Sequence, residues 1–467
     1  MRPTIRWGFL CLLVIWPVQV HATTYYVDRA HQSASDANPG TEALPLRTVN
    51  EGASRLTVPG DTMIVKAGTY DVGGLGDWNT PAIQPPVSGT ANARITMMVN
   101  PGDTVILQGS NAHIIGTAHR DYVTVDGFTI HGTIKVMGAS DRVEGAIIQN
   151  NTLIGWQSPD CGNWEAMSVR QATNVLIRNN RISGFHSTPK GCDGVGVRMY
   201  NATDIVMENN YIFDVGDGLY DKVNGTRNIF RYNFIHDCAR TGIRVRSGSG
   251  ATHRDDQVYG NIVWRCGISV TGSSTNPNVN TKVYNNTVDA QGITVSAGTT
   301  NTQVWNNIFY QSSFSAPSGV TFCDYNLYYQ GSGCGTNSVT GDPQFVNTAF
   351  KNPADWKLQA SSPARGRGRN GEDIGAYSSN STVVGITSTT APPPGPSPVA
   401  PDAPSNLRIT RIGWSGSDSP STGGGSHENR RFLLRHDLRL QRQGCRHRLY
   451  GHWRERDRNL HRTLHER

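Results

Sequence analysis

Short apolar segments recur along the central part of the chain, and asparagine follows most of them. Typical units are Ile148–Asn151, Ile177–Asn180 and Val283–Asn286. The final asparagines are 29, 30, 23, 28, 25, 21 and 19 residues apart: Asn151, Asn180, Asn210, Asn233, Asn261, Asn286, Asn307 and Asn326. A second column has a glycine followed by two apolar residues one position apart, and it includes Gly194, Gly242, Gly267 and Gly292. This alternation predicts short strands with one buried face.

Strands this short cannot bury their apolar faces alone, so they must stack on neighbours into a solenoid. Parallel strands stack about 4.8 Å apart, which lets the asparagine side chains bond to one another along the stack. The units are too short for the blades of a β-propeller, which need about 40 residues or more. We therefore predict an all-β chain whose residues 23–378 form a right-handed parallel β-helix, in which the asparagines have a structural role.

The ends of such a solenoid need covering, because an open end exposes the hydrogen-bonding groups of its sheets. Leu46, Val49, Ala53 and Leu56 follow helical spacing. These residues predict an N-terminal capping helix over the first coil. At the other end, we expect the segment up to Asp373–Tyr377 to close the domain.

The first residues have the order of a secretory signal peptide. Arg2 and Arg6 precede an apolar run, Trp7–Trp16, and small residues suited to cleavage follow. The run is shorter than the ~20 residues that span a bilayer. We expect residues 1–22 to be removed, no membrane span, and a secreted, periplasmic or cell-surface protein.

The net charge of +7 at pH 7 belongs to the C-terminal part of the chain. Residues 411–467 contain 13 arginines, no lysine and 6 acidic residues, so the preceding residues are close to neutral overall. A basic pI therefore does not indicate a nucleic-acid partner for the β-helix.

A Ser/Thr/Pro-rich linker is predicted for residues 379–402. The next segment, Ala403–Thr410, resembles the first strand of a fibronectin type III module. The alternation that a β-sandwich requires is lost after it, and arginine and histidine dominate instead. We interpret residues 403–467 as a truncated or frame-shifted module and expect it to be disordered; the alternative is a basic anchor to an anionic surface.

Six of the eight cysteines fall within the repeat region, and none belongs to a CxxC motif, which argues against a zinc–thiolate site. In an exported protein they can form disulfides, and Cys323 with Cys334 is the most local pair. Free buried thiols are the alternative.

Basic residues recur when the coils are aligned on the glycine column. Arg170, Arg198, Lys222 and Arg246 follow one another at intervals of 28, 24 and 24 residues, with Arg244 beside the last. Stacked like charges repel unless an anion or a neighbouring acid compensates them. We predict a single basic column on one outer sheet and an anionic ligand; the alternative is a solvated face neutralised by local acids.

Acidic residues lie next to these basic positions in the sequence. Asp193 and Asp217 are 24 residues apart and each precedes a glycine, so we predict that they stack. Asp221 occupies a position that is apolar in neighbouring coils, where a carboxylate needs a partner or a cation. The three acids are our candidate Ca²⁺ ligands. The alternative is ion pairing with the basic column.

The chain resembles secreted right-handed β-helix proteins of the pectate-lyase-like superfamily over residues 24–378. The segments that carry the resemblance are Tyr25–Asp28, Pro59–Thr62, Ala67–Tyr70 and Asp373–Tyr377, together with the asparagine-punctuated coils. That superfamily contains lyases, hydrolases, epimerases and non-catalytic members, so the resemblance concerns the fold more than the activity.

This chain resembles two lyase families of this superfamily around the candidate site. Asp193, Asp217 and Asp221 resemble the acids of calcium-dependent pectate lyases, although Arg244 stands where those enzymes have a lysine base. Lys222 with Arg244 or Arg246 resembles the lysine and arginine of alginate and chondroitin lyases.

The resemblance implies β-elimination on an acidic, uronic-acid-containing polysaccharide. Lys222 would be the base, and Arg244 and Arg246 would hold the carboxylate or the developing enolate. Substrate-binding candidates are Arg170, Arg198 and Tyr220, with Tyr200 as a further aromatic candidate for sugar stacking. The alternatives are a non-catalytic polysaccharide-binding β-helix and a polygalacturonase-like hydrolase with paired carboxylates. We expect a monomer.

Overall fold

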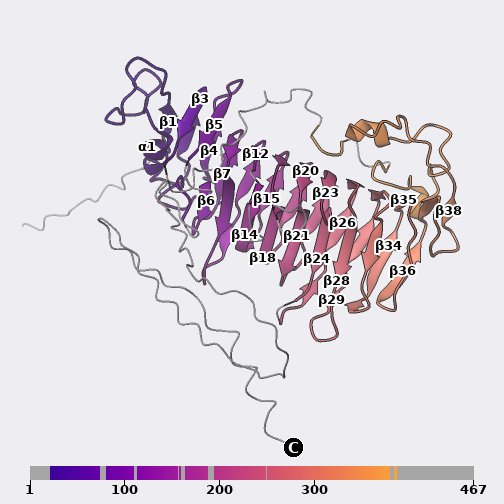
Figure 1. Cartoon of the computed structure of the whole chain (residues 1–467). Coiled ribbons are helices and arrows are strands. Elements are labelled where there is room, and N and C mark those ends of the chain that lie inside the picture. The colour runs from indigo at the N-terminus through magenta and orange to yellow at the C-terminus, as the bar shows by residue number, and fades with distance from the viewer. Residues whose placement is uncertain are drawn as a thin grey trace, which may run out of the picture. The chain divides into compact units, whose positions relative to one another are not determined.

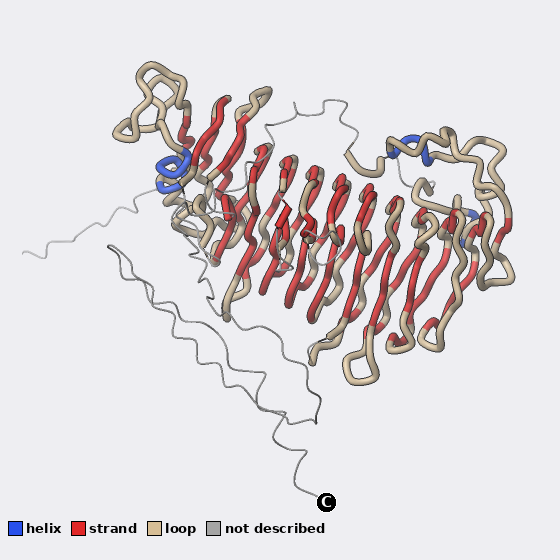
Figure 2. The backbone as a smooth tube through the Cα atoms, in the orientation of Figure 1, coloured by secondary structure: helices blue, strands red, loops and turns tan. Residues whose placement is uncertain are grey.

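The computed structural model describes residues 21–73, 80–109, 113–155, 157–158, 164–187, 194–248, 250–378 and 383–386. Strands dominate the described residues, and they form three long sheets in which all paired strands are parallel. The all-β parallel solenoid predicted from the repeats is confirmed. Figure 1 shows the strands stacked side by side in chain order, and Figure 2 shows the loops that join them at each turn.

Sheet A has 12 strands. They are β1 (Thr24–Val27), β2 (Thr62–Val65), β4 (Ile95–Val99), β7 (Val123–Asp126), β11 (Ile147–Gln149), β15 (Leu176–Arg178), β19 (Val206–Glu208), β22 (Ile229–Arg231), β26 (Gln257–Tyr259), β30 (Lys282–Tyr284), β34 (Thr302–Trp305) and β36 (Val320–Asp324).

Sheet B also has 12 strands. They are β3 (Gly68–Asp71), β5 (Val105–Gln108), β8 (Thr129–His131), β12 (Thr152–Ile154), β16 (Arg181–Ser183), β20 (Tyr211–Val215), β23 (Phe234–Cys238), β27 (Ile262–Trp264), β31 (Thr287–Val288), β35 (Ile308–Tyr310), β37 (Leu327–Tyr329) and β38 (Val339–Thr340).

Sheet C has nine strands. They are β6 (His113–Ala118), β9 (Thr133–Met137), β14 (Glu165–Thr173), β18 (Val195–Thr203), β21 (Asp217–Val223), β24 (Ile243–Arg246), β28 (Ile268–Thr271) and β32 (Ile293–Val295), with β10 (Val143–Glu144) paired to β14. Two small sheets join β13 (Gln157–Ser158) to β17 (His186–Ser187), and β25 (His253–Arg254) to β29 (Asn278–Val279) and β33 (Thr299–Thr300).

Each coil of the central region contributes one strand to sheet A, one to sheet B and one to sheet C, in that order along the chain. Ile177 on β15, Ile182 on β16 and Val197 on β18 are fully buried. Apolar side chains from the three sheets therefore share one continuous core, as expected for strands that cannot bury a face alone.

The asparagine ladder fills the turn between sheets A and B. The backbone N–H of Asn180 donates to Oδ1 of Asn210 at 3.0 Å, and its Nδ2 donates to the same atom at 3.1 Å and to the carbonyl of Ile148 at 2.9 Å. Equivalent bonds join the other ladder asparagines, and all are at most 1% exposed: Asn151, Asn180, Asn210, Asn233, Asn261, Asn286, Asn307 and Asn326. The structural role predicted for this column is confirmed.

The capping helix is present as α1 (Val49–Ser54). The hydroxyl of Thr48 accepts a hydrogen bond from the backbone N–H of Glu51, which satisfies one of the donors at the start of the helix. Val49 and Ala53 are buried, and α1 packs on β1 and β2 at the first coil. The helix is shorter than the apolar spacing suggested, because Leu46 forms a β-bridge with Val27 instead.

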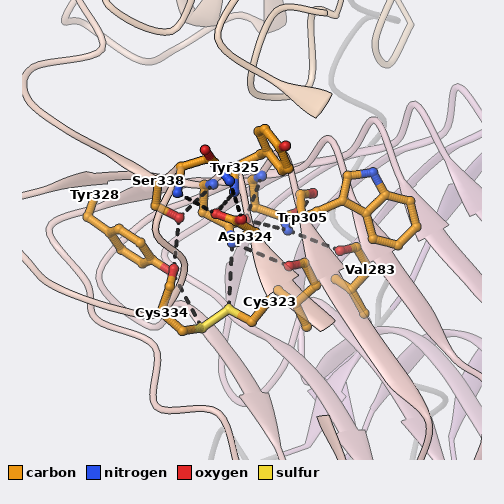
Figure 3. Close-up of a disulfide and its surroundings, with 12 residues drawn as sticks. Val283, Trp305, Cys323, Asp324, Tyr325, Tyr328, Cys334 and Ser338 are labelled. Atoms are coloured by element: carbon orange, nitrogen blue, oxygen red, sulfur yellow. Dashed lines mark hydrogen bonds between the residues drawn. A yellow bond between two sulfur atoms is a disulfide. The ribbon is translucent and has the colours of Figure 1, made fainter. Parts of the chain in front are cut away.

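Two disulfides lie in the described residues. The predicted Cys323–Cys334 bridge is confirmed, and Figure 3 shows it beside Tyr328 and Ser338, whose hydroxyls both donate to the carbonyl of Cys334. A second bridge, Cys238–Cys266, ties two successive coils. Cys161 and Cys192 lie outside the described residues.

The chain after β38 returns over the outer face of sheet B. Two short 3₁₀ helices, η1 (Pro353–Trp356) and η2 (Arg369–Gly371), belong to this segment. Val384 is fully buried in the same apolar cluster as Phe234, and the N–H of Gly385 donates to the carbonyl of Tyr232 at 2.7 Å. Residues 383–386, beyond the predicted boundary at 378, therefore also pack on the β-helix.

Residues 1–20 of the predicted signal peptide and the fibronectin-like segment, residues 403–467, lie outside the described residues. Within the described part of the chain, no helix is long and apolar enough to cross a membrane.

Candidate functional site

The outer face of sheet C carries the predicted basic residues and Tyr220, but in a different order from the one predicted. Arg198 on β18 pairs in register with Ser168 on β14 and Tyr220 on β21, and Tyr220 pairs in turn with Arg244 on β24. Lys135 on β9 continues the same column below Ser168. This column therefore alternates cations with serine and tyrosine.

A neighbouring column begins with Arg170 on β14, which pairs with Tyr200 on β18. The register between β18 and β21 then shifts, so that Met199 faces Asp221 while Tyr200 faces Val223. Lys222 is the extra residue of this β-bulge. Bulges re-aim side chains and are common beside active sites.

The predicted single column of Arg170, Arg198, Lys222 and Arg246 is thus wrong. The glycines that align in the structure are Gly196 and Gly218, because a Cβ added at Gly196 would lie 2.6 Å from the carbonyl oxygen of Gly218. The prediction instead aligned Gly194, two residues earlier, with the glycines of the other coils. It therefore placed Arg198 in line with Lys222 and Arg246, whereas Arg198 pairs with Tyr220 and, beyond it, Arg244.

Tyrosine rings separate the cations of the two columns. The guanidinium of Arg170 lies 4.4 Å from the centroid of the Tyr200 ring, and Nζ of Lys222 lies 5.3 Å from the same centroid. Arg244 lies 5.1 Å from the Tyr220 ring, whose hydroxyl accepts a hydrogen bond from Nη1 of Arg246 at 3.2 Å. Cation–π contacts of this kind reduce the repulsion expected between stacked like charges.

Lys135, at one end of the first column, is buried and was not predicted from the sequence. Nζ of Lys135 lies 3.5 Å from Oε1 of Glu165, which also lies 3.3 Å from Arg170, while Oε2 lies 3.6 Å from Arg198. Burial lowers the pKa of Lys135 to about 8, with Glu165 opposing the shift and the two arginines adding to it. The signal in the sequence was a lysine within the apolar strand Thr133–Met137.

Asp217, the first residue of β21, contacts two arginines of this face. Its Oδ2 lies 2.7 Å from Nη2 of Arg240, and its Oδ1 lies 3.3 Å from Nη2 of Arg244. Burial raises the pKa of the Asp217 carboxyl, and the two arginines oppose that shift. Asp217 pairs in register with Val195, so the predicted stacking of Asp217 on Asp193 is wrong.

The predicted calcium site of Asp193, Asp217 and Asp221 does not form as proposed. Asp217 and Asp221 are four residues apart on the extended strand β21, a separation of about 13 Å at roughly 3.3 Å per residue. Asp221 is fully buried inside the solenoid, beside His253, as its inward position predicted. Asp193 lies outside the described residues.

The sheet C array, as used below, comprises nine charged side chains and the two tyrosines, Tyr200 and Tyr220. Its seven cations are Lys135, Arg170, Arg198, Lys222, Arg240, Arg244 and Arg246, and its two carboxylates are Glu165 and Asp217. These nine charges leave an excess of five positive charges when Lys135 is protonated. Lys135 and Arg198 are 1% exposed, whereas Lys222 is half-buried and Arg246 is exposed.

Such an array attracts an anionic polymer and supplies donors for its carboxylates. The half-buried ring of Tyr200 lies among these cations and offers an apolar face for sugar contacts, whereas Tyr220 is only 4% exposed. A lysine side chain that is half-buried on a bulge of this face is a candidate proton acceptor.

Comparisons with known proteins agree with the fold. A family model described as "Right handed beta helix region" matches residues 110–288, which supports the predicted hand. No curated protein matches this chain in sequence.

Several solved structures are similar to this chain at low identity. The complex structure of XylC with xylose has a TM-score of 0.45 and 13% identity, covering 69% of this chain and 87% of that one. Pectate lyase Pel9A has a TM-score of 0.41 and 14% identity, with coverage of 77% and 97%. The GH136 lacto-N-biosidase from Eubacterium ramulus, as its selenomethionine derivative, has a TM-score of 0.38 and 12% identity, with coverage of 68% and 67%.

Proposed function

We propose that this chain is an exported polysaccharide lyase that cleaves a uronic-acid-containing polymer by β-elimination. The observation that carries the proposal is the sheet C array, where seven cations and two carboxylates surround two tyrosines. An excess of positive charge on this face suits a substrate with a carboxylate on each residue.

The chemistry requires a charge-stabilising group and a base. Arg244 and Arg246 would hold the C6 carboxylate and stabilise the negative charge that develops on it as the C5–H bond breaks. Lys222 in its neutral form would accept the C5 proton. The C5–H electron pair then forms the C4–C5 double bond, the C4–O bond breaks, and the departing oxygen takes up a proton.

Lys222 is a better base than Lys135 because of its position. The amino group of Lys135 is 1% exposed and lies against Glu165, so it is inaccessible to a polymer. Lys222 is half-buried, on a bulge beside the exposed Arg246 and the Tyr200 ring. Lys135 instead contacts Glu165, which also contacts Arg170 and Arg198.

A hydrolase with paired carboxylates is less well supported. The two carboxylates of the array are both almost fully buried and paired with arginines. Neither is placed to protonate a glycosidic oxygen at the accessible end, as a general acid must.

Non-catalytic binding is the second candidate function, and a groove on the outer face of sheet A favours it. This hollow of about 600 Å³ is lined in part by Arg227, Gln257, Lys282 and Gln303. Beside it, the rings of Tyr259 and Tyr284 stack at 4.7 Å, and those of Tyr284 and Trp305 at 4.5 Å. Polar and aromatic side chains of this kind can bind a sugar chain without chemistry.

The test is a screen of the purified full chain on pectate, alginate and glycosaminoglycans, with and without added calcium. Ultraviolet absorbance of the unsaturated product reports β-elimination, and reducing ends without that absorbance report hydrolysis. A lyase gives both the absorbance and new reducing ends on at least one uronate polymer. Binding to a polymer with neither signal would support the second candidate and overturn the lyase proposal.

A further inference from the structure

The interior of the solenoid holds a second group of ionisable side chains, separate from the sheet C array. Asp221 on β21, His253 on β25 and Asp256 just before β26 are all fully buried. Asp221 belongs to one coil, and His253 and Asp256 belong to the next. Three such groups are costly to bury unless each is paired or bound to a cation.

Hydrogen bonds among the described residues leave this group incompletely satisfied. Neither ring nitrogen of His253 makes a hydrogen bond, although the ring is fully buried. Oδ1 of Asp221 and Oδ2 of Asp256 also have none. Two of these unsatisfied atoms, Nδ1 of His253 and Oδ2 of Asp256, lie only 3.5 Å apart.

The separations suit a small divalent cation. Nδ1 of His253 lies 3.5 Å from Oδ2 of Asp256 and 3.8 Å from Oδ2 of Asp221, and one ligand atom from each residue lies within 4.8 Å of the others. Ligands bonded to zinc at about 2.0–2.2 Å in a tetrahedron are roughly 3.4 Å apart. Small side-chain movements would therefore bring all three onto one ion.

The two carboxylates are held in place by Asn228 and Gly225. Asn228 donates from Nδ2 to Oδ2 of Asp221 at 2.7 Å, and its backbone N–H donates to Oδ1 of Asp256 at 2.8 Å. At Gly225, an added Cβ would lie 2.0 Å from Oδ2 of Asp221, so only glycine leaves room for the carboxylate. Supporting contacts that orient ligands in this way are typical of metal sites.

We propose that Asp221, His253 and Asp256 bind one divalent transition-metal ion of the zinc class inside the solenoid. Two carboxylates and a neutral imidazole balance a charge of +2, so the buried group becomes neutral as a whole. Calcium fits less well, because it takes about six to eight oxygen ligands and here one of the three ligands is a nitrogen. The ion links successive coils directly behind Lys222, which follows Asp221 in the chain.

Metal content tests the proposal. Because the site is sealed, the ion should enter during folding. The full chain is denatured with chelator, refolded with Zn²⁺ alone, dialysed and analysed by mass spectrometry of the elements. We expect one zinc per chain, retained after dialysis against chelator under native conditions.

Matched variants locate the ion. His253→Gln and Asp256→Asn should lower the bound zinc at least tenfold, whereas Asp289→Asn, which changes another buried acid outside the group, should leave one zinc per chain. Retention of zinc in His253→Gln would overturn the assignment of the ligands.

A second measurement needs no variant. Refolding of the unaltered chain with Co²⁺ should give visible absorption bands of a four- or five-coordinate ion with nitrogen and oxygen ligands. Wild-type chain that folds fully with Zn²⁺ or Co²⁺ present and binds neither ion would overturn the proposal. Binding of Ca²⁺ but not Zn²⁺ would overturn the ion class.

Discussion

Single residues of the sheet C array show how a strongly positive face can be built on stacked strands. Strands in register place side chains about 4.8 Å apart, a distance at which two guanidinium groups would repel. Here Tyr220 stands between Arg198 and Arg244 in register, and Tyr200 stands next to Arg170. The rings keep the cations apart while leaving them on one face.

Lys222 is the residue on which the proposed chemistry depends. Lys222→Ala should lower turnover on the active polymer by roughly 10²–10⁴-fold, because loss of a general base typically costs this much. Binding should persist, since Arg170, Arg244 and Arg246 remain. Initial rates of unsaturated product, with binding measured separately by calorimetry, check the expectation.

Lys135→Met is the matched comparison, because it removes an ammonium group from the buried end of the same array. Its effect should come through the positions of Glu165 and Arg198, so KM should rise more than kcat falls. If Lys135→Met loses turnover and Lys222→Ala does not, Lys135 is the base and the assignment made here is wrong.

Lys135 also predicts a dependence of stability on pH. Its pKa is about 8 in the folded chain and about 10.4 when unfolded, so between these values the unfolded chain binds more protons. The contribution of Lys135 to the free energy of unfolding therefore rises with pH across this window, by at most about 1.4 kcal/mol per pH unit. Urea unfolding of wild type and Lys135→Met from pH 7 to 10 should show the difference growing in favour of wild type. A constant difference would mean that Glu165 keeps the pKa of Lys135 near its ordinary value.

Among elements, the turn between sheets A and B is the most regular feature, and its stability rests on the asparagine ladder. Oδ1 of Asn233 accepts from both nitrogens of Asn210, while its Nδ2 donates to the carbonyl of Met207 at 2.9 Å and to Oδ1 of Asn261 at 2.9 Å. Each coil is thereby joined to the ones before and after it.

Asn233→Ala should destabilise the chain by several kcal/mol. It leaves the buried hydrogen-bonding partners of Asn233 unsatisfied, which costs about 1–3 kcal/mol each. Asn92→Ala is the control, because Asn92 is exposed, lies outside the ladder and does not have the positive φ that alanine disfavours. Its change should stay within about 0.5 kcal/mol. Chemical denaturation measures both, and equal effects would show that the ladder adds no stability.

The repeats were enough to predict the elements, but the register between them was not. Asparagine and inward apolar residues have one position per coil, so their spacing reveals the solenoid. The segment Gly194–Arg198 contains two glycines, and the sequence does not say which one aligns with Gly218. The bulge at Lys222 adds one residue without any composition signal.

Other parts of the candidate sites depend on contacts between distant segments. His253 on β25 and Asp256, just before β26, lie outside both repeated columns, and only the stacking of two coils brings them to Asp221. Asp217 was predicted as a metal ligand from its place before a glycine. Its arginine partner at residue 240 lies in the following turn, where the repeat pattern gives no position.

At the scale of the whole β-helix, both the first coil and the outer face of sheet B are covered by segments outside the repeats. α1 packs on β1 and β2, and the described residues 345–378 and 383–386 supply apolar side chains that cover the outer face of sheet B. Phe234 and Ile262, which point outward from sheet B, are fully buried in this second apolar cluster. The C-terminal cover thus hides apolar surface that the repeats leave exposed.

The last few described residues belong to this cover, which leads to the final prediction. Val384 is 0% exposed, whereas its neighbour Val383 is 42% exposed. Val384→Ala should lower the free energy of unfolding by about 1–3 kcal/mol, because it removes two buried methyl groups and leaves a cavity. Val383→Ala changes the same atoms at the surface and should have an effect within about 0.5 kcal/mol.

Two shortened chains extend this test. A chain that ends at Ile386 keeps Val384 and the bond from Gly385 to Tyr232, so its Tm should equal that of the full chain. A chain that ends at Ser378 loses both and should melt several degrees lower, since each kcal/mol shifts Tm by a few degrees in domains of this size or smaller. A lower Tm for the chain that ends at Ile386 would show that residues 387–467 also stabilise the β-helix. Equal Tm values for both shortened chains would place the edge of the stable body at residue 378, as the sequence first suggested.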